Sequence, residues 1–83
     1  MPDIEVRLPE LGDDAPNEAT ISFFMVAEGE AIGKDDDLVE VLTDKATFNV
    51  PSPMSGKVKR ICAKEDDVVK VGDILAVIET EEE

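Results

Sequence analysis

The sequence predicts an all-β domain, a flattened β-barrel or sandwich of two four-stranded antiparallel sheets with pseudo-two-fold symmetry. Three observations lead to this fold class. Apolar and polar residues alternate in short stretches, no window shows the period of an amphipathic helix, and the two halves of the chain resemble each other. With 83 residues the chain has room for one core only, so residues 1–83 are expected to form a single domain.

Short stretches rich in β-branched and apolar residues mark the expected strands. In chain order they are "IEVRL" (4–8), "TISFFMV" (20–26), "LVEVL" (38–42), "ATFNV" (46–50), "GKVKRI" (56–61) and "DILAVI" (73–78). Gly, Pro, Asp and Asn separate them, as is typical of turns. Gly12, Gly29 and Gly72 are expected at turns, because a positive φ costs glycine little.

An internal repeat indicates the symmetry. Sliding the chain by 36 positions places residues 27–44 over residues 63–80, with identical pairs at Ala27/Ala63, Lys34/Lys70, Asp37/Asp73 and Val41/Val77. Each half would form a sheet with one apolar face, and two such faces are buried only by packing together. The same shift carries Lys45 onto Glu81, which predicts that the region of Lys45 and the chain end lie at opposite ends of the molecule.

The stretch "LTDKATFNV" (42–50) predicts a hairpin. A four-residue turn from Thr43 to Ala46 pairs residues 39–42 with residues 47–50 in antiparallel order. Strand alternation then places one set of side chains on the core face, namely Val39, Val41, Phe48 and Val50. The outer face receives Glu40, Leu42, Thr47 and Asn49. Lys45 is left at the tip, in water.

Charge and composition exclude several functions. Lys and Arg number 8 against 21 Asp and Glu, and the formal charge of −13 repels nucleic acid and anionic membranes. Partners with basic patches are expected, unless the acidity serves only solubility. Cys62 is the only cysteine and there is no histidine, so an internal disulfide, a zinc site and a Cys/His nucleophile are all excluded. We expect no metal, no catalytic residue and a monomeric isolated domain.

Lys45 is the residue with the clearest candidate chemistry. A Schiff-base lysine needs a depressed pKa, whereas a turn position beside Asp44 favours the charged ammonium. An acceptor of covalent modification needs only exposure and a defined backbone. Asp44 is expected to define that backbone by bonding nearby N–H groups through its carboxylate.

Several pieces in order give the chain a family resemblance. "TDKATFNVPSPMSG" resembles the lipoylation site of lipoyl domains of 2-oxo acid dehydrogenase complexes, the biotinyl/lipoyl carrier family. "VRLPELGD" resembles the family's first strand and loop, and "VVKVGDILAVIE" its closing turn and strand. Biotin carrier domains are similar in fold but have methionines on both sides of their lysine, where this chain has Asp44 and Ala46.

The resemblance implies a non-catalytic carrier whose lipoic acid forms an amide with Lys45. Thr43, Asp44, Ala46 and Gly56 would contribute to recognition of the site. The implied partners are a thiamin-diphosphate-dependent decarboxylase, an acyltransferase core, dihydrolipoyl dehydrogenase and lipoate-attaching enzymes. The domain would be the N-terminal part of a longer acyltransferase, in the cytoplasm of a bacterium or the mitochondrial matrix of a eukaryote. "DKA" resembles the pyruvate or branched-chain complexes more than the oxoglutarate complex, and pyruvate is the preferred substrate. A biotinyl carrier and an unmodified acidic interaction module are the alternatives.

Docking of partners is expected at two places. The family commonly has a glutamate three positions before the lysine, and this chain has Leu42 there, on the predicted outer face. Either the attaching enzyme tolerates the change or Leu42 makes an exposed apolar contact with a partner. The loop "LGDDAPNEA" lies beside the lysine in the family, which makes Asp13 and Asp14 docking candidates.

Overall fold

The computed structural model describes residues 2–12 and 17–80, which contain eight β-strands and no helix. In chain order the strands are β1 (Asp3–Arg7), β2 (Glu18–Phe24), β3 (Ala31–Ile32), β4 (Asp37–Leu42), β5 (Thr47–Pro51), β6 (Gly56–Ile61), β7 (Val68–Lys70) and β8 (Ile74–Thr80). Within the described ranges there is accordingly no helix long and apolar enough to cross a membrane.

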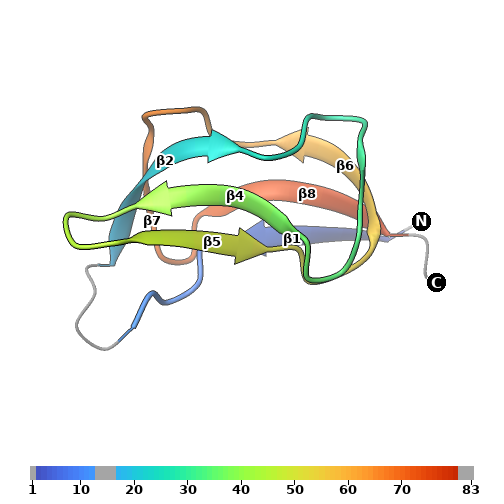
Figure 1. Cartoon of the computed structure of the whole chain (residues 1–83). Coiled ribbons are helices and arrows are strands. Elements are labelled where there is room, and N and C mark those ends of the chain that lie inside the picture. The colour runs from blue at the N-terminus through green and yellow to red at the C-terminus, as the bar shows by residue number, and fades with distance from the viewer. Residues whose placement is uncertain (1, 13–16, 81–83) are drawn as a thin grey trace.

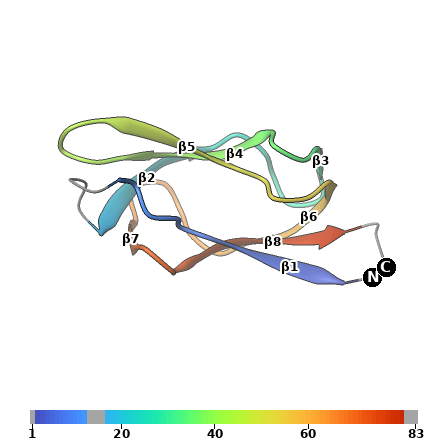
Figure 2. The same cartoon turned by 90° about the horizontal axis from the view of Figure 1, so that it is seen from below.

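The strands form two four-stranded antiparallel sheets, ordered β1-β8-β6-β3 and β5-β4-β2-β7. The sheets lie one over the other, and the molecule is flattened, at 37 × 23 × 17 Å (Figures 1 and 2). The predicted fold class is therefore confirmed. Strands β3 and β7 were not among the expected stretches, because two or three residues are too few to reveal an alternation.

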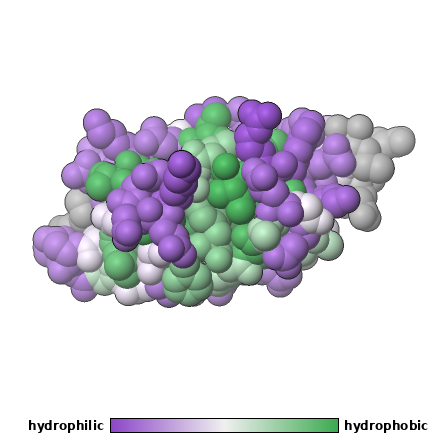
Figure 3. Space-filling view, turned by 90° about the horizontal axis from the view of Figure 1, so that it is seen from above, coloured by the Kyte–Doolittle hydropathy of each residue, from purple (hydrophilic) through white to green (hydrophobic). Residues whose placement is uncertain are grey.

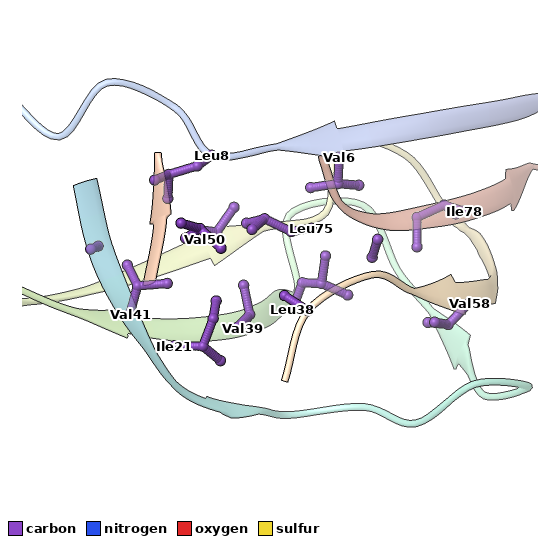
Figure 4. Close-up of a cluster of buried hydrophobic side chains, with 14 of the residues drawn as sticks. Val6, Leu8, Ile21, Leu38, Val39, Val41, Val50, Val58, Leu75 and Ile78 are labelled. Atoms are coloured by element: carbon purple, nitrogen blue, oxygen red, sulfur yellow. The ribbon is translucent and has the colours of Figure 1, made fainter. Parts of the chain in front are cut away.

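The core lies between the two sheets, and side chains from both point into it (Figure 4). Its buried members are aliphatic: Val6, Leu8, Ala19, Ile21, Ile32, Leu38, Val39, Val41, Val50, Val58, Ala63, Val69, Leu75, Ala76 and Ile78. Burying one Val, Leu or Ile side chain fully contributes about 1.5–3 kcal/mol. Hydrophilic residues cover most of the face shown in Figure 3, with apolar surface concentrated in its middle.

The pseudo-two-fold symmetry is present, but its register differs from the predicted one by one residue. Asp36 Oδ2 accepts the N–H of Gly33 at 3.0 Å, and Asp73 Oδ2 accepts the N–H of Lys70 at 2.8 Å. These matching turns relate residues 37 positions apart, as Asp36 is from Asp73. Both sheets also break register at equivalent points, after Ile21 in β2 and after Val58 in β6.

Burial explains why the shift of 37 is the structural one. It superimposes Leu38 on Leu75 and Val41 on Ile78, and all four side chains are fully buried. A shift of 36 instead places buried Val41 on half-buried Val77. Over residues 27–44 the two shifts produce equal numbers of identical pairs, but a slip of one residue exchanges the faces of a strand. The predicted equivalence of Lys34 with Lys70 is therefore wrong.

Turn conformations follow the same symmetry. Gly29 and Gly72 have φ of 92° and 93°, and Gly12 has 130°, as predicted for turn glycines. The symmetry partners of the first two are Asp66 and Asp35, with φ of 72° and 71°. Aspartate tolerates the left-handed region better than most residues, so each half uses glycine at one turn and aspartate at the other.

Candidate functional site

The β4–β5 hairpin has the predicted register. Leu42 pairs with Thr47 and Val39 with Val50, and the N–H of Thr43 donates to the carbonyl of Ala46 at 2.9 Å. The core-face valines are 0–3% exposed, whereas Leu42 is 38% exposed. The hairpin projects from one end of the molecule, while β1 begins and β8 ends at the other, as expected (Figure 1).

The turn is organised by Thr43, not by Asp44 as the sequence suggested. Thr43 Oγ1 accepts the N–H of Lys45 at 3.2 Å and that of Ala46 at 3.1 Å. The same hydroxyl donates to the carbonyl of Ala46 at 3.3 Å. A threonine at the first turn position performs the role expected of the aspartate, because its hydroxyl both accepts and donates. Asp44 remains exposed at the tip, beside Lys45.

Lys45 is exposed, and the ion pairs found among the described residues do not involve it. Those pairs join Arg7 to Glu5 and Lys59 to Asp3, both on the other sheet. The Lys45 ammonium takes part in neither ion pair, and its backbone is held in the hydrogen-bonded turn, so it is accessible to a modifying enzyme. Burial, the usual means of activating a catalytic lysine, is absent from this position.

A shallow hollow of about 540 Å³ lies next to the tip. Its lining comes from the start of β2, the end of β4, the turn and β7: Glu18, Ala19, Thr20, Leu42, Thr43, Asp44 and Val68. Leu42 and Val68 are 38% and 62% exposed, so the hollow displays apolar surface. Sequence alternation predicted the exposure of Leu42, but Val68 could be brought beside it only by the pairing of β7 with β2.

Gly56, another predicted site residue, is not at the tip. Gly56 pairs with Thr80 and Ile32, near the end of the molecule where β8 ends. A Cβ at Gly56 would overlap the carbonyl oxygen of Glu79, so packing alone requires glycine there. Asp13 and Asp14 lie outside the described residues. The described end of their loop does reach the site, since Glu18 lines the hollow.

The described residues offer no group of three or more His, Cys, Asp or Glu side chains that could hold a metal ion. The site therefore consists of an exposed amine, a hydrogen-bonded turn and an apolar hollow. This arrangement can hold a covalently attached group at the surface and present it to other proteins.

Comparisons with known proteins agree with this geometry. The family model described as "Biotin-requiring enzyme", of the biotin/lipoyl family, matches residues 4–78. The dihydrolipoyllysine-residue succinyltransferase component of the 2-oxoglutarate dehydrogenase complex of Bartonella vinsonii subsp. berkhoffii is 45% identical over 90% of the chain. The dihydrolipoyllysine-residue acetyltransferase component of the pyruvate dehydrogenase complex of Corynebacterium glutamicum is 41% identical over 88%. The chain spans only 18% and 11% of the length of these relatives.

A solved structure matches from end to end. The solution structure of the lipoyl domain of the 2-oxoglutarate dehydrogenase complex from Azotobacter vinelandii aligns with a TM-score of 0.66 at 28% identity, covering 94% of this chain and 96% of that one. Family, fold and coverage agree. The chain therefore belongs to the biotin/lipoyl family, and its fold is that of a lipoyl domain.

Proposed function

We propose that Lys45 is the lipoyl attachment site, and that the domain carries acyl groups and electrons between the active sites of a 2-oxo acid dehydrogenase complex. The observation that carries the proposal is the exposed amine of Lys45, at the tip of a turn that Thr43 fixes through three hydrogen bonds. The residues present fit an amide-linked group, because nothing in the turn competes for the amine.

Each residue of the turn has a defined part in this function. The bonds from Thr43 hold the backbone N–H groups of Lys45 and Ala46, so an attaching enzyme meets one conformation of the lysine. Amide formation removes the ammonium charge, leaving Asp44 as the charged group at the tip. Bound lipoate supplies a dithiolane that accepts an acyl group together with two electrons. The arm reaches on the order of 15 Å, as about a dozen bonds of roughly 1.5 Å allow.

The domain itself contributes proximity. Tethering keeps the arm at about millimolar local concentration near each partner, so transfer does not depend on diffusion of free lipoamide. The partners we propose are a thiamin-diphosphate-dependent decarboxylase, the acyltransferase core and dihydrolipoyl dehydrogenase. The formal charge of −13 supports docking to basic surfaces, which mainly raises association rates and weakens with salt. Asp13 and Asp14 remain the proposed docking residues of the loop.

For the substrate we propose pyruvate, on the basis of the sequence Asp44-Lys45-Ala46. The similar relatives named above include components of both a pyruvate and a 2-oxoglutarate complex, at 41% and 45% identity. Reductive acylation of the lipoylated domain by purified pyruvate and 2-oxoglutarate decarboxylases, with each 2-oxo acid, tests this choice. Faster acylation by the 2-oxoglutarate enzyme would contradict it. A bacterial cytoplasm or a mitochondrial matrix is the proposed location.

Co-expression with a lipoate-attaching enzyme tests the site. Intact mass should increase by one lipoyl group, and peptide mapping should locate it on Lys45. Lys45→Arg keeps the charge and should abolish the increase, whereas Lys34→Arg should not. Lipoate on Lys34, Lys57 or Lys70 would refute the assignment. Biotin on Lys45 in cells that contain both ligases would favour the biotinyl carrier, and an unmodified chain would favour the acidic interaction module.

A further inference from the structure

A row of side chains crosses the outer face of the β5-β4-β2-β7 sheet at the foot of the Lys45 turn. Thr47 pairs with Leu42, Leu42 with Thr20, and Thr20 with Val68. Their neighbours along the strands, such as Val41, point into the core, so these four side chains point outward. We call these four residues the hairpin row. It is uncharged, and Leu42 and Val68 expose 38% and 62% of their surface.

The symmetry-related row on the other sheet provides an internal comparison. There Asp3 pairs with Glu79, Glu79 with Lys57, and Lys57 with Ala31. Three of these four residues are charged, as is usual for an exposed sheet face. Because the backbones of the two rows are equivalent, the fold does not require an apolar row beside Lys45. The difference is specific to the end that carries the lysine.

The hairpin row also lies over a hollow. Leu42, Thr20 and Val68 line the space of about 540 Å³ beside the tip, together with Ala19, Thr43 and the two acidic residues Glu18 and Asp44. Lys45 follows Asp44 directly in the chain, so a group attached to it starts within a side chain's length of a residue that lines this hollow. The extended arm is about as long as the distance across a four-stranded sheet, since neighbouring strands lie roughly 5 Å apart.

We propose that the hollow is a binding site for the lipoyl arm of the same domain, with the carbon chain lying on Leu42, Thr20 and Val68. This inference rests on attachment at Lys45, as proposed above. An amide-linked arm is neutral and mostly hydrocarbon, which suits the exposed side chains of Leu42 and Val68 and the uncharged row to which they belong. Each methylene group that leaves water favours the docked position by about fourfold. The unmodified ammonium stays in water.

The arm suits this site better than a protein partner does. Stable protein interfaces bury about 800 Å² per partner, far more than the exposed parts of two aliphatic side chains. A tethered arm needs little area, because its effective concentration at the hollow is about millimolar. Docking would shield the chain between transfers, and a partner would release it by contacting the same end of the domain.

NMR spectroscopy on a defined conjugate tests the proposal. Octanoyl-lysine is placed at position 45 by codon reassignment, and acetyl-lysine at the same position is the control, since it removes the charge without adding the chain. Nuclear Overhauser effects are expected between the octanoyl methylenes and the methyl groups of Leu42 and Val68. Leu42→Glu introduces the residue type of its symmetry partner Glu79, and it should remove the nuclear Overhauser effects to Val68. Met25→Ser, an exposed apolar residue outside the hollow, should retain them.

Two results would overturn the proposal. One is identical amide shifts around the hollow in the octanoyl and acetyl domains, and the other is contacts with Val68 that persist in Leu42→Glu. If Leu42→Glu disturbs the fold, Val68→Ser serves instead, because Val68 is 62% exposed. Codon reassignment needs no attaching enzyme, so absence of docking would leave the proposed attachment intact. Failure of enzymatic lipoylation at Lys45 would instead refute the attachment.

Discussion

The two ends of the molecule use the same backbone arrangement for different purposes. At the hairpin end, the N–H and hydroxyl of Thr43 donate to the carbonyl of Ala46 at 2.9 and 3.3 Å. At the terminal end, where β1 begins and β8 ends, the N–H and hydroxyl of Thr80 donate to the carbonyl of Pro2 at 3.0 and 3.3 Å. At the hairpin end, β4 and β5 are joined through Asp44 and Lys45. At the terminal end, β1 and β8 lead to the two ends of the chain.

This comparison separates what the fold requires from what the site requires. Threonine recurs at both ends, so it belongs to the fold. Lys45 and the uncharged hairpin row occur at one end only, and the charged row with Glu79 and Lys57 takes the equivalent place at the other. Features that break the symmetry are therefore the ones to test for function. Features that obey the symmetry should contribute similarly to stability at both ends.

The largest effect is expected for a charge on the core face. Val41 and its symmetry partner Ile78 are both 0% exposed. Val41→Glu and Ile78→Glu should each cost several kcal/mol, enough to unfold a domain of ordinary stability. Leu42→Glu, one residue along on the outer face, should change the unfolding free energy by no more than about 0.5 kcal/mol. Urea denaturation measures all three. Equal destabilisation by Val41→Glu and Leu42→Glu would mean that the hairpin register is wrong.

A smaller but clear effect is expected where the two halves pack differently. Gly56 corresponds to Ala19, yet a Cβ at Gly56 would meet the Glu79 carbonyl oxygen and Cγ2 of Ile78. Gly56→Ala should destabilise the domain by about 1–3 kcal/mol, because the added methyl group overpacks the sheet. Ala19→Gly should cost about 0.5–1 kcal/mol through chain entropy. Denaturation midpoints compare them, and a stabilising Gly56→Ala would contradict the packing role.

Removal of the Thr43 hydroxyl should affect modification more than stability. Thr43→Ala deletes the oxygen that accepts the N–H groups of Lys45 and Ala46, at a cost of about 1 kcal/mol at this exposed turn. The initial rate of lipoylation should fall, and Thr43→Ser should restore it. Thr80→Ala is the control at the terminal end, where stability should change but lipoylation of the folded protein should not. An unchanged rate in Thr43→Ala would show that the attaching enzyme does not depend on the turn geometry.

The smallest effect concerns an ion pair on the other sheet. The hydrogen bond from Lys59 Nζ to Asp3, at 2.8 Å, and the charge of that carboxylate raise the pKa of Lys59 above its ordinary value of 10.5. Such a group stabilises the fold fully below its unfolded pKa, and the contribution disappears as pH rises through the folded pKa. Asp3→Asn should return the Lys59 pKa toward 10.5, as side-chain NMR titration can follow.

Because the ion pair of Lys59 with Asp3 lies on the surface, the denaturation midpoint of the domain should be nearly the same in the unmodified sequence and in Asp3→Asn at neutral pH. The matching position in the other half is Ser22, which does not titrate. An unshifted Lys59 titration in Asp3→Asn would show that the ion pair is not formed in solution.

Much of the fold could be predicted because alternation is a local property. The strands containing Val39, Val41 and Val50 were placed correctly, as was the turn between them, since a single slip would have exposed the valines. The repeat was recognised but misplaced by one position. Identity of residue types cannot fix the register of two weakly similar strands, whereas burial on one face can.

The class of fold, the exposure of Lys45 and the outward direction of Leu42 could all be derived from the sequence, because each depends on the period-two geometry of neighbouring residues. The folded structure was needed to show which residue holds the turn, since Thr43 and Asp44 both have suitable oxygens and the backbone geometry selects Thr43. It also decided that Val68 joins Leu42 beside the lysine, and that Gly56 serves packing at the distant end. Those relations come from strand pairings between residues far apart in the chain, and local sequence patterns do not encode them.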